Sequence, residues 1–304
     1  MRFLMLCREP RLYSCQRLQQ ACEQRGIHLD ILDPNRMLIK LAVEQGQSIL
    51  QLYYQAGETY DKNRPPPQLL ADYDAVLPRF GTTSTEMGCR VLRYFEAKQV
   101  KVLNNSTAFA LARDKWLSLQ ALVTAQIAVP ASSLAGELYS VDGHLTQHQL
   151  PLVTKTLSGS QGVGVMLAES KQNAQSVLAV LQQAKLAYLL QDFVAESKGQ
   201  DIRAFVVGGR VVAAMQRCSN EGEFRANIHL GGKAQTIVLT EAEQQLAVKA
   251  AKAIGLSVAG VDLIRSDSGL LVLEVNASPG LEGIEQASGI DIAGLMIDHL
   301  IHSL

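Results

Sequence analysis

The chain has 304 residues and 47% hydrophobic content, which is enough for two domains that each bury a core of their own. Its formal net charge of -1 excludes a general attraction to nucleic acid or to an anionic membrane, so any polyanion must be bound by a local site. No stretch reaches the roughly 18 consecutive apolar residues of a membrane span, and the first residues predict a strand and no signal peptide. The five cysteines are odd in number and form no CxxC pair, which favours a reduced, cytoplasmic protein with cysteines in its cores.

The first hundred residues predict a small doubly wound α/β domain. The expected strands are residues 3–7, 28–32, 75–77 and 100–103. A helix is expected between the first two strands and another between the last two, and a strand, a helix and a strand within about thirty residues indicate a parallel unit. Its ligand face is expected beyond the carboxyl ends of the strands. Residues 36–68 show no single period, and we expect a pair of short strands or an irregular excursion there.

The second part of the chain predicts further helices and a set of hairpins. Asp114 is placed to cap a helix at its N-terminus. The run around Gly208-Gly209 predicts a hairpin with a two-residue turn. Thr240 and Glu243 form a capping box for a later helix, and residues 292–300 predict the last helix.

Polar side chains interrupt a second predicted hairpin, whose apolar strands are residues 258–264 and 270–275. Asp262 lies in the first strand, and Glu274 and Asn276 lie two apart in the second, on one face. If the turn closes with three residues, Asp262 lies across from Glu274. Two carboxylates among apolar side chains repel each other unless a cation neutralises them, and oxygen ligands suit Mg²⁺ or Mn²⁺ beside phosphates. The simpler alternative is that these acids point to solvent from an edge strand.

Two lysines could meet such phosphates. Lys155 lies in a predicted strand that runs into the glycine-rich loop 158–162, whose backbone N–H groups would be open to phosphate oxygens. The loop matches neither the Walker nor the Rossmann pattern, and by itself a plain glycine hairpin explains it better. Lys115 follows the capping Asp114, where a solvated lysine is the simpler interpretation.

Three arginines are predicted on or beside the sheet that holds the acidic hairpin: Arg203, Arg217 and Arg225. Buried arginines must pair with acids or face an anion, and any one of them alone is best explained as a structural ion pair. Together with Asn227 and Gly231-Gly232, they favour a site built for developing negative charge.

These segments together resemble a known family. The chain contains ARDKW, VTKTLSGSQGVGV, LQDFV, GQDIRAFVVGGRVVAAMQR, FRANIHLGG, VAGVDLI and LEVNASPGLEGIE. They resemble the ATP-grasp ligases, and most closely the RimK-type α-L-glutamate ligases, which add glutamates to the C-terminus of a small-subunit ribosomal protein. The likeness runs nearly end to end and weakens over residues 36–68.

The resemblance implies a fold and a domain plan. It implies an N-terminal doubly wound α/β pre-ATP-grasp domain over residues 1–104 and a two-lobed ATP-grasp domain over residues 105–304. The central lobe would cover about 105–188 and the C-terminal lobe about 189–304.

The resemblance also implies a role for each matching residue. The implied nucleotide-binding residues are Lys115, Lys155, Gly159, Ser160, Gln161, Gly162, Asp192, Phe193, Asp201, Arg225, Ala226 and Asn227. The lysines would hold the phosphates, the glycine loop would cover them, and Asp192 with Phe193 would form the hinge that receives the adenine. Asp262, Glu274 and Asn276 would bind the metal. Arg217 is the candidate for stabilising the transition state of acyl transfer, with Arg203 beside it.

The sequence departs from the family pattern at three positions. The family pattern has Thr where Ser160 stands, Ser where Ala226 stands and Arg where Leu230 stands. The third departure removes a charge near the expected substrate entrance, so the chemistry is implied more firmly than the substrate.

The implied reaction is an ATP-dependent ligation. A carboxylate attacks the γ-phosphate of ATP, with two ions of Mg²⁺ or Mn²⁺ offsetting the charge, and the α-amino group of L-glutamate then displaces phosphate. The acceptor would be a ribosomal small-subunit protein or a growing poly-glutamate chain, and a homo-oligomer, dimer or tetramer, is expected. The alternatives are an ATP-grasp ligase for another amino acid or cofactor, and a non-catalytic ATP-binding regulator.

Overall fold

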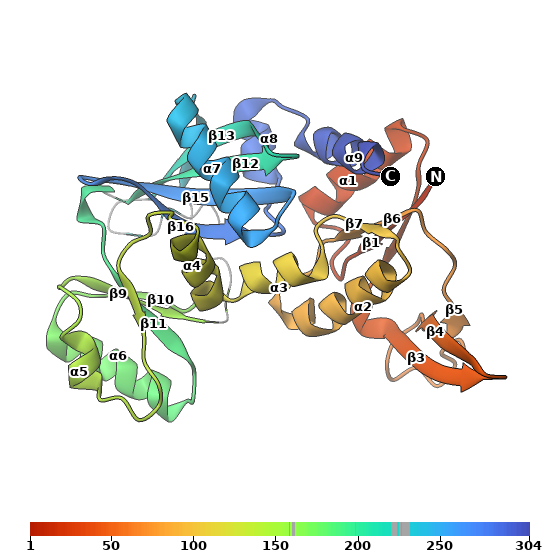
Figure 1. Cartoon of the computed structure of the whole chain (residues 1–304), viewed down its shortest axis with the longest axis horizontal. Coiled ribbons are helices and arrows are strands. Elements are labelled where there is room, and N and C mark those ends of the chain that lie inside the picture. The colour runs from red at the N-terminus through yellow and green to blue at the C-terminus, as the bar shows by residue number, and fades with distance from the viewer. Residues whose placement is uncertain (158, 160–161, 198, 220–223, 225, 227–231) are drawn as a thin grey trace. The chain divides into compact units, whose positions relative to one another are not determined.

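The computed structural model describes residues 1–157, 159, 162–197, 199–219, 224, 226 and 232–304. The chain divides into two compact units, which are described separately below (Figure 1). Unit 1 consists of Met1–Ala110, Gly280–Glu282 and Asp291–Leu304, and unit 2 consists of Leu111–Pro279 and Gly283–Ile290.

Unit 1 is built on a four-stranded sheet in the order β2-β1-β6-β7, with all neighbours parallel. Its strands are β1 (Arg2–Leu6), β2 (His28–Leu32), β6 (Ala75–Pro78) and β7 (Lys101–Val102), which confirms the predicted doubly wound α/β domain. The helices of this unit are α1 (Tyr13–Gln24), α2 (Thr85–Ala97) and α9 (Ile292–His302). Strand β1 is buried from Phe3 to Leu6 and is an inner strand of the sheet, flanked by β2 and β6.

The last helix of the chain belongs to unit 1. Helix α9 lies beside α1, and the ion pair Arg25 Nε to Asp298 Oδ1 at 2.6 Å joins the end of α1 to α9. Arg17 in α1 also contacts Asp291, the residue that caps α9, at 2.7 Å. The two ends of the sequence therefore complete one unit.

A separate antiparallel sheet occupies the region where the sequence was hardest to interpret. Strands β3 (Met37–Glu44) and β4 (Gln47–Tyr54) form a hairpin, and the short β5 (Gln68–Leu69) pairs with β4. The predicted pair of strands is confirmed, and each strand is eight residues long.

Unit 2 contains two antiparallel sheets. The first has the order β10-β9-β11-β8, with β8 (Ser132–Leu134), β9 (Leu152–Thr156), β10 (Val165–Ala168) and β11 (Tyr188–Asp192). Helices α5 (Val141–Leu145) and α6 (Lys171–Gln183) pack on it through Leu145, Ala174, Leu178 and Leu181, which contact Leu152 and Leu190 in a buried cluster. The apolar spacing in α6 places these residues on one side, as expected for an amphipathic helix.

The second sheet has the order β14-β13-β12-β15-β16. Its strands are β12 (Gln200–Val207), β13 (Arg210–Cys218), β14 (Lys233–Thr236), β15 (Val258–Ser266) and β16 (Gly269–Asn276). The predicted turn at Gly208-Gly209 is confirmed, with φ of 57° and 76°, a backbone conformation that glycine adopts without strain.

Further helices connect these strands. They are α3 (Ser106–Arg113), α4 (Lys115–Thr124), α7 (Glu241–Ile254) and α8 (Glu282–Ser288), with 3-10 turns at Pro34–Arg36, Thr82–Ser84 and Ala195–Ser197. Asp114 accepts hydrogen bonds from the N–H groups of Trp116 and Leu117, so the predicted cap of α4 is confirmed. The capping box of Thr240 and Glu243 at the start of α7 is confirmed as well.

The hairpin of β15 and β16 reaches its predicted register by an unpredicted route. Ser266 pairs with Gly269, so the turn closes with two residues and not with three. A two-residue turn alone would place Asp262 opposite Leu273, but the register shifts by one residue between Asp262 and Leu263. Because of this bulge, Asp262 lies across from Glu274, as predicted.

Candidate active site

A row of charged residues crosses the five-stranded sheet of unit 2. Arg203 on β12 lies directly opposite Asp262 on β15, which in turn lies directly opposite Glu274 on β16. Residues directly opposite each other in an antiparallel sheet project from the same face. The sheet therefore places a guanidinium and two carboxylates side by side.

Asp262 is engaged by two arginines. Its Oδ1 accepts from Arg203 Nε at 2.7 Å, and its Oδ2 accepts from Arg203 Nη2 at 2.6 Å and from Arg217 Nη2 at 2.9 Å. Arg217 also donates twice to Asp201, at 2.6 Å in both contacts. Asp262 is only 3% exposed, so this network satisfies a charge that would otherwise be buried alone.

The network shifts the pKa values of both aspartates. Burial opposes ionisation of Asp262, but Arg203 and Arg217 outweigh burial and lower its pKa to about 2. Burial dominates at Asp201 and raises its pKa, although Arg217 opposes this shift. Asp262 therefore stays ionised to a lower pH than Asp201 in this network.

Glu274 and Asn276 lie together at the end of β16. Asn276 Nδ2 donates to Glu274 Oε1 at 3.0 Å, and both side chains are half-buried. They line a small cavity of about 30 Å³ together with Lys115 and Lys155. This cavity brings the two predicted lysines to two of the three predicted metal ligands.

The side chains of Lys155 and Lys115 are partly shielded from water, which affects the pKa of each. Burial lowers the pKa of Lys155, while the negative charge of Glu274 opposes that shift. Burial likewise lowers the pKa of Lys115, with Glu274 again opposing it. Lys115 Nζ also donates to the carbonyl oxygen of Gly159 at 3.2 Å, which connects α4 to the glycine-rich loop.

The described glycines of this loop occupy backbone positions that favour glycine over residues with a side chain. Gly164 has φ of +77°, and a Cβ there would lie 2.1 Å from Thr156 Oγ1 on β9. Gly159 also lies close to the backbone of Val163, since a Cβ would lie 2.8 Å from the Val163 carbonyl oxygen. Gly162 lies in the turn with φ of +79°. The loop thus returns tightly onto β9, the strand of Lys155.

The predicted hinge residues lie at the end of β11. Asp192 is its last residue, and Phe193 contacts Phe224 edge to face with ring centroids 6.3 Å apart. Asp192 Oδ1 also lies 2.6 Å from His148 Nδ1, and His148 Nε2 lies 2.5 Å from Ser133 Oγ.

These contacts belong to a histidine cluster that was not predicted from the sequence. His144 Nε2 lies 2.7 Å from Ser133 Oγ, so both histidines meet one hydroxyl. If His148 Nδ1 donates to Asp192, then Ser133 donates to His148 and accepts from His144. His144 and His148 stand four residues apart, and this spacing was a visible signal.

Several predicted site residues lie outside the described residues: Ser158, Ser160, Gln161, Arg225, Asn227 and Leu230. Ala226 is described as half-buried and without regular secondary structure. The roles expected for these residues stay predictions.

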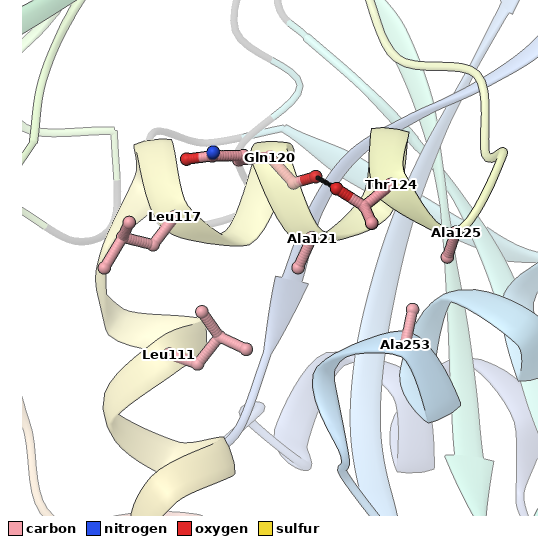
Figure 2. Close-up of a pocket in the computed structure, with 7 residues that line it drawn as sticks. All are labelled: Leu111, Leu117, Gln120, Ala121, Thr124, Ala125 and Ala253. Carbon is pink, nitrogen blue, oxygen red and sulfur yellow. Dashed lines mark hydrogen bonds between the residues drawn. The ribbon is translucent and has the colours of Figure 1, made fainter.

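A wider hollow of about 530 Å³ lies between α4 and α7 (Figure 2). Its lining residues are Leu111, Leu117, Gln120, Ala121, Thr124, Ala125 and Ala253. None of them is ionisable, so this hollow offers no group for catalysis or for neutralising phosphate. The smaller cavity with two lysines and a carboxylate is the better candidate.

The donor groups of the smaller cavity suit Mg²⁺ in part. Glu274 and Asn276 present side-chain oxygens from one strand end, and oxygen is the ligand that Mg²⁺ prefers. Each carboxylate oxygen of Asp262 already accepts from an arginine, so an ion bound there would share the carboxylate with Arg203 and Arg217. Among the described residues, no three acidic, histidine or cysteine side chains are grouped as a metal site. Since Mg²⁺ usually takes one or two carboxylates with waters and phosphate oxygens, the residues fit it.

Comparison with known families covers nearly the whole chain. Residues 112–300 match the RimK-like ATP-grasp domain, and residues 1–109 match the RimK PreATP-grasp domain. The chain belongs to the RimK family of ATP-grasp ligases. This confirms the predicted fold class, with a pre-ATP-grasp domain ahead of an ATP-grasp domain.

Relatives of this RimK-family chain are similar over nearly their full length. A probable alpha-L-glutamate ligase from Haemophilus ducreyi is 69% identical over 99% of both chains. A protein of the same description from Pasteurella multocida is 56% identical over 99% of this chain and 94% of its own length.

Solved structures share the fold of the RimK family. The ATP-grasp ligase PsnB in complex with a minimal precursor aligns with a TM-score of 0.71 at 20% identity, over 100% of this chain and 99% of that chain. A RimK domain ATP-grasp protein from Sphaerobacter thermophilus aligns with the same TM-score at 21% identity, over 98% of this chain and 99% of that chain.

Within the described residues, no helix is both long and apolar enough to span a membrane. The five cysteines are all free.

Proposed function

We propose that this RimK-family protein is an ATP-dependent carboxylate-amine ligase that adds L-glutamate to the C-terminus of a peptide or protein. The observation that carries the proposal is the cavity in which Lys115 and Lys155 meet Glu274 and Asn276. Two cations beside a carboxylate and an amide suit the phosphates of a nucleotide with its divalent ion. Relatives at up to 69% identity are described as probable alpha-L-glutamate ligases, which supports glutamate as the amine substrate.

The lysines bind the phosphates in this proposal. Lys155 projects from a strand and Lys115 from the first turn of α4, so regular elements hold both charges in place. Their contribution is electrostatic, because phosphoryl transfer depends on positioning and on neutralising charge. Gly159 and Gly162 offer backbone N–H groups to the same phosphates, and the glycine loop keeps water from the acylphosphate.

Glu274 and Asn276 would hold Mg²⁺, with Asp262 as the third predicted ligand. When bound, the ion neutralises phosphate charge and draws electron density from the phosphoryl oxygens. Two ions, and Mn²⁺ in place of Mg²⁺, are part of the proposal. A solved relative in the same fold class, PsnB, is described with Mg and ADP.

The arginines act on the acyl group. The acceptor carboxylate attacks the γ-phosphate of ATP, which gives an acylphosphate and ADP, and the α-amino group of glutamate displaces phosphate to leave an amide. Arg217 and Arg203 steady the developing negative charge. Both lie beside Asp262, which sets the direction of their guanidinium groups.

The first acceptor in this proposal is the C-terminus of a ribosomal small-subunit protein. Further glutamates would then be added to the growing poly-glutamate chain. PsnB and another solved ATP-grasp ligase are described in complexes with a precursor or with a leader and core peptide, so peptides bind to ligases of this fold class. Reaction in the cytoplasm fits the five free cysteines.

The test is incubation of the protein with ATP, Mg²⁺, glutamate and a set of peptides with free C-termini. The expected products are ADP, phosphate and peptides heavier by one or more glutamate residues, read by mass spectrometry. The matched control is the same peptide set with amidated C-termini, which offer no C-terminal carboxylate. The absence of any glutamate adduct on every acceptor would contradict the proposal.

The same assay separates the two alternatives. A ligase for another amino acid would release ADP with that amino acid in place of glutamate. A non-catalytic regulator would bind ATP and leave it intact with every substrate supplied.

A further inference from the structure

Two cysteine side chains of unit 1 touch each other. Cys7 directly follows β1, and Cys15 is the third residue of α1. Their sulfur atoms lie 3.2 Å apart, and one thiol donates a hydrogen bond to the other. The sulfur atoms of a disulfide lie about 2.05 Å apart, so a movement of about 1 Å would close one here. Both cysteines are free, and the structure therefore shows the reduced form of a pair that is placed to be oxidised.

Backbone hydrogen bonds hold both cysteines in place. The N–H of Cys7 donates to the carbonyl oxygen of Leu32 at 2.9 Å, which continues the pairing of β1 with β2. The N–H of Cys15 donates to the carbonyl oxygen of Leu12 at 2.9 Å, at the start of α1. The contact between the two thiols therefore follows from the positions of a strand end and a helix start.

A positive charge lies beside this pair of thiols. Arg79 directly follows β6, and its backbone N–H donates to the carbonyl oxygen of Leu6 on β1 at 2.9 Å. Arg79 and Cys7 thus leave neighbouring strands at the same edge of the sheet. Arg79 Nε is buried and meets no acceptor among the described residues. The groups whose negative charge stabilises this guanidinium are the two cysteine thiols, because a thiolate there offsets the cost of burying it.

The two thiols differ in how readily they ionise. The hydrogen bond from Cys7 and the charge of Arg79 lower the pKa of Cys15 to about 7, although burial opposes this shift. The same hydrogen bond, together with burial, raises the pKa of Cys7. The N-terminal end of a helix also favours a thiolate, and Cys15 lies in the first turn of α1. Because the thiolate is the nucleophile, Cys15 is the sulfur that reacts first.

Cys22 on the same helix provides a contrast. It is buried, and burial raises its pKa to about 11. Among the described hydrogen bonds, none joins Cys22 to a second thiol. A buried thiol of raised pKa reacts slowly, so the expected reactivity belongs to the pair and not to every cysteine of the unit.

The segment between the two cysteines decides which oxidant can reach them. Residues 8–12 are all exposed, whereas Cys7 is 3% exposed and Cys15 is 2% exposed. A small molecule reaches the sulfur atoms after a slight movement of this segment, but a bulky disulfide such as oxidised glutathione does not. Hydrogen peroxide is an oxidant of the required size.

We propose that Cys7 and Cys15 form a redox site that hydrogen peroxide oxidises to an intramolecular disulfide. The Cys15 thiolate attacks one oxygen of peroxide and breaks the O–O bond, which gives a sulfenic acid and hydroxide. The hydroxide takes up the proton that Cys15 lost on ionising. Cys7 then attacks the Cys15 sulfur, the S–O bond breaks, and the hydroxyl leaves as water with the Cys7 proton. The two thiols lose two electrons, and one peroxide becomes two waters.

The disulfide would be reversible and would change the charge of its surroundings. A small dithiol such as dithiothreitol restores both thiols by exchange. In the oxidised form Arg79 loses the thiolate beside it, so the carboxyl edge of the sheet becomes more positive. Where thiols are kept reduced, a disulfide of this kind forms transiently in response to an oxidant.

The first test is peptide mapping of the full-length protein after dilute hydrogen peroxide and blocking of the remaining thiols. Trypsin cuts after Arg8 and Arg11, so the peptides 3–8 and 12–17 separate unless a disulfide joins them. The expected product is this linked pair, lighter by the hydrogen atoms lost on oxidation, and dithiothreitol should abolish it. Cys22→Ala is the matched control and should leave the yield of the linked pair unchanged.

The second test separates the roles of the two sulfurs. Cys7→Ser keeps a hydroxyl donor beside Cys15 and removes the sulfur that closes the disulfide. Cys15 should then stop at the sulfenic acid and be labelled by dimedone. Cys15→Ser should leave Cys7 unlabelled under the same conditions, because Cys7 is a buried thiol.

The third test concerns the arginine. Arg79→Gln removes the charge that favours the Cys15 thiolate, and oxidation of Cys15 should slow about tenfold. Arg8→Gln is the matched control, because Arg8 is exposed and adjoins Cys7 in sequence, and it should leave the rate unchanged. Thermal unfolding checks that both variants are folded, and the cysteine variants test the pair independently of Arg79.

Three results would overturn the proposal. The first is wild-type protein that gives no linked pair of peptides 3–8 and 12–17 after peroxide. The second is oxidation of Cys22 as fast as of Cys15. The third is equal dimedone labelling of Cys15 in Cys7→Ser and of Cys7 in Cys15→Ser, since the two sulfurs would then have no distinct roles.

Discussion

Arg203 and Asp262 face each other across β12 and β15 and join through two hydrogen bonds of 2.7 and 2.6 Å. This side-by-side geometry is the strongest form of an arginine–carboxylate contact. It gives Asp262 a structural task in addition to its predicted metal-binding one. Arg217 shares the same carboxylate, so one side chain ties the two arginines together.

Asp262→Asn tests this structural task. The substitution leaves two arginines without their shared charge in a place where Asp262 is 3% exposed, and we expect the free energy of unfolding to fall by about 3 kcal/mol. Urea denaturation measures it. Asp267→Asn, in the exposed turn of the same hairpin, is the matched control and should change stability by less than about 0.5 kcal/mol. Equal stability of the two variants would show that the arginine network is not structural.

Glu274→Gln separates chemistry from stability. Glu274 is half-buried at the cavity and pairs with no arginine in the described contacts, so the fold should be retained. The site loses a negative charge that would hold the divalent ion beside the phosphates, and we expect turnover to fall about 100-fold or more. Coupled-enzyme detection of ADP measures the rate, and thermal unfolding checks the fold. Near-normal ligation by this variant would remove Glu274 from the site.

Lys155→Met tests phosphate binding. Loss of a charged donor should weaken ATP binding about tenfold to a hundredfold, because hydrogen bonds to charged groups contribute most. Titration with a fluorescent ATP analogue measures the affinity. Lys171→Met, on an exposed lysine of α6, should leave it unchanged. If the two variants bind alike, Lys155 does not contact the nucleotide.

His144 should make stability depend on pH. Burial lowers the pKa of His144, so the unfolded chain takes up a proton there at a higher pH than the folded chain. Stability should therefore be fully retained above about pH 6.5 and fall as the pH decreases below it. Urea denaturation between pH 5 and 8 measures how the free energy of unfolding depends on pH. His148, Tyr139 and Tyr188 pack around His144 and form its surroundings.

The controls for this prediction use the same readout. His144→Gln removes the titrating group and should flatten the slope. His28→Gln changes a histidine whose side chain is 67% exposed and should leave the slope as it is. An unchanged slope in His144→Gln would contradict the assignment.

Gly164→Ala tests the close return of the glycine loop. A methyl group would lie 2.1 Å from Thr156 Oγ1, and alanine disfavours φ of +77°, so we expect a loss of about 1 to 3 kcal/mol. Gly136→Ala meets no atom within 4 Å and is the control. Thermal unfolding of both variants gives the comparison, and equal midpoints would mean that the loop has room for a side chain.

The sequence by itself determined the features that depend on neighbouring residues. The helix cap at Asp114, the capping box of Thr240 and Glu243, and the turn at Gly208-Gly209 follow from local backbone geometry and hydrogen bonding. Alternating apolar residues also placed Asp262 and Glu274 on one face of a hairpin.

Tertiary structure decided what depends on residues far apart in the chain. The bulge that sets Asp262 opposite Glu274 shifts the register by one residue, and the turn sequence does not predict this shift. The pairing of Asp262 with Arg203 and Arg217 joins three strands, and α9 completes a unit that begins with β1. Local propensity carries no information on such contacts, because packing and charge pairing between distant segments select them only when the chain folds.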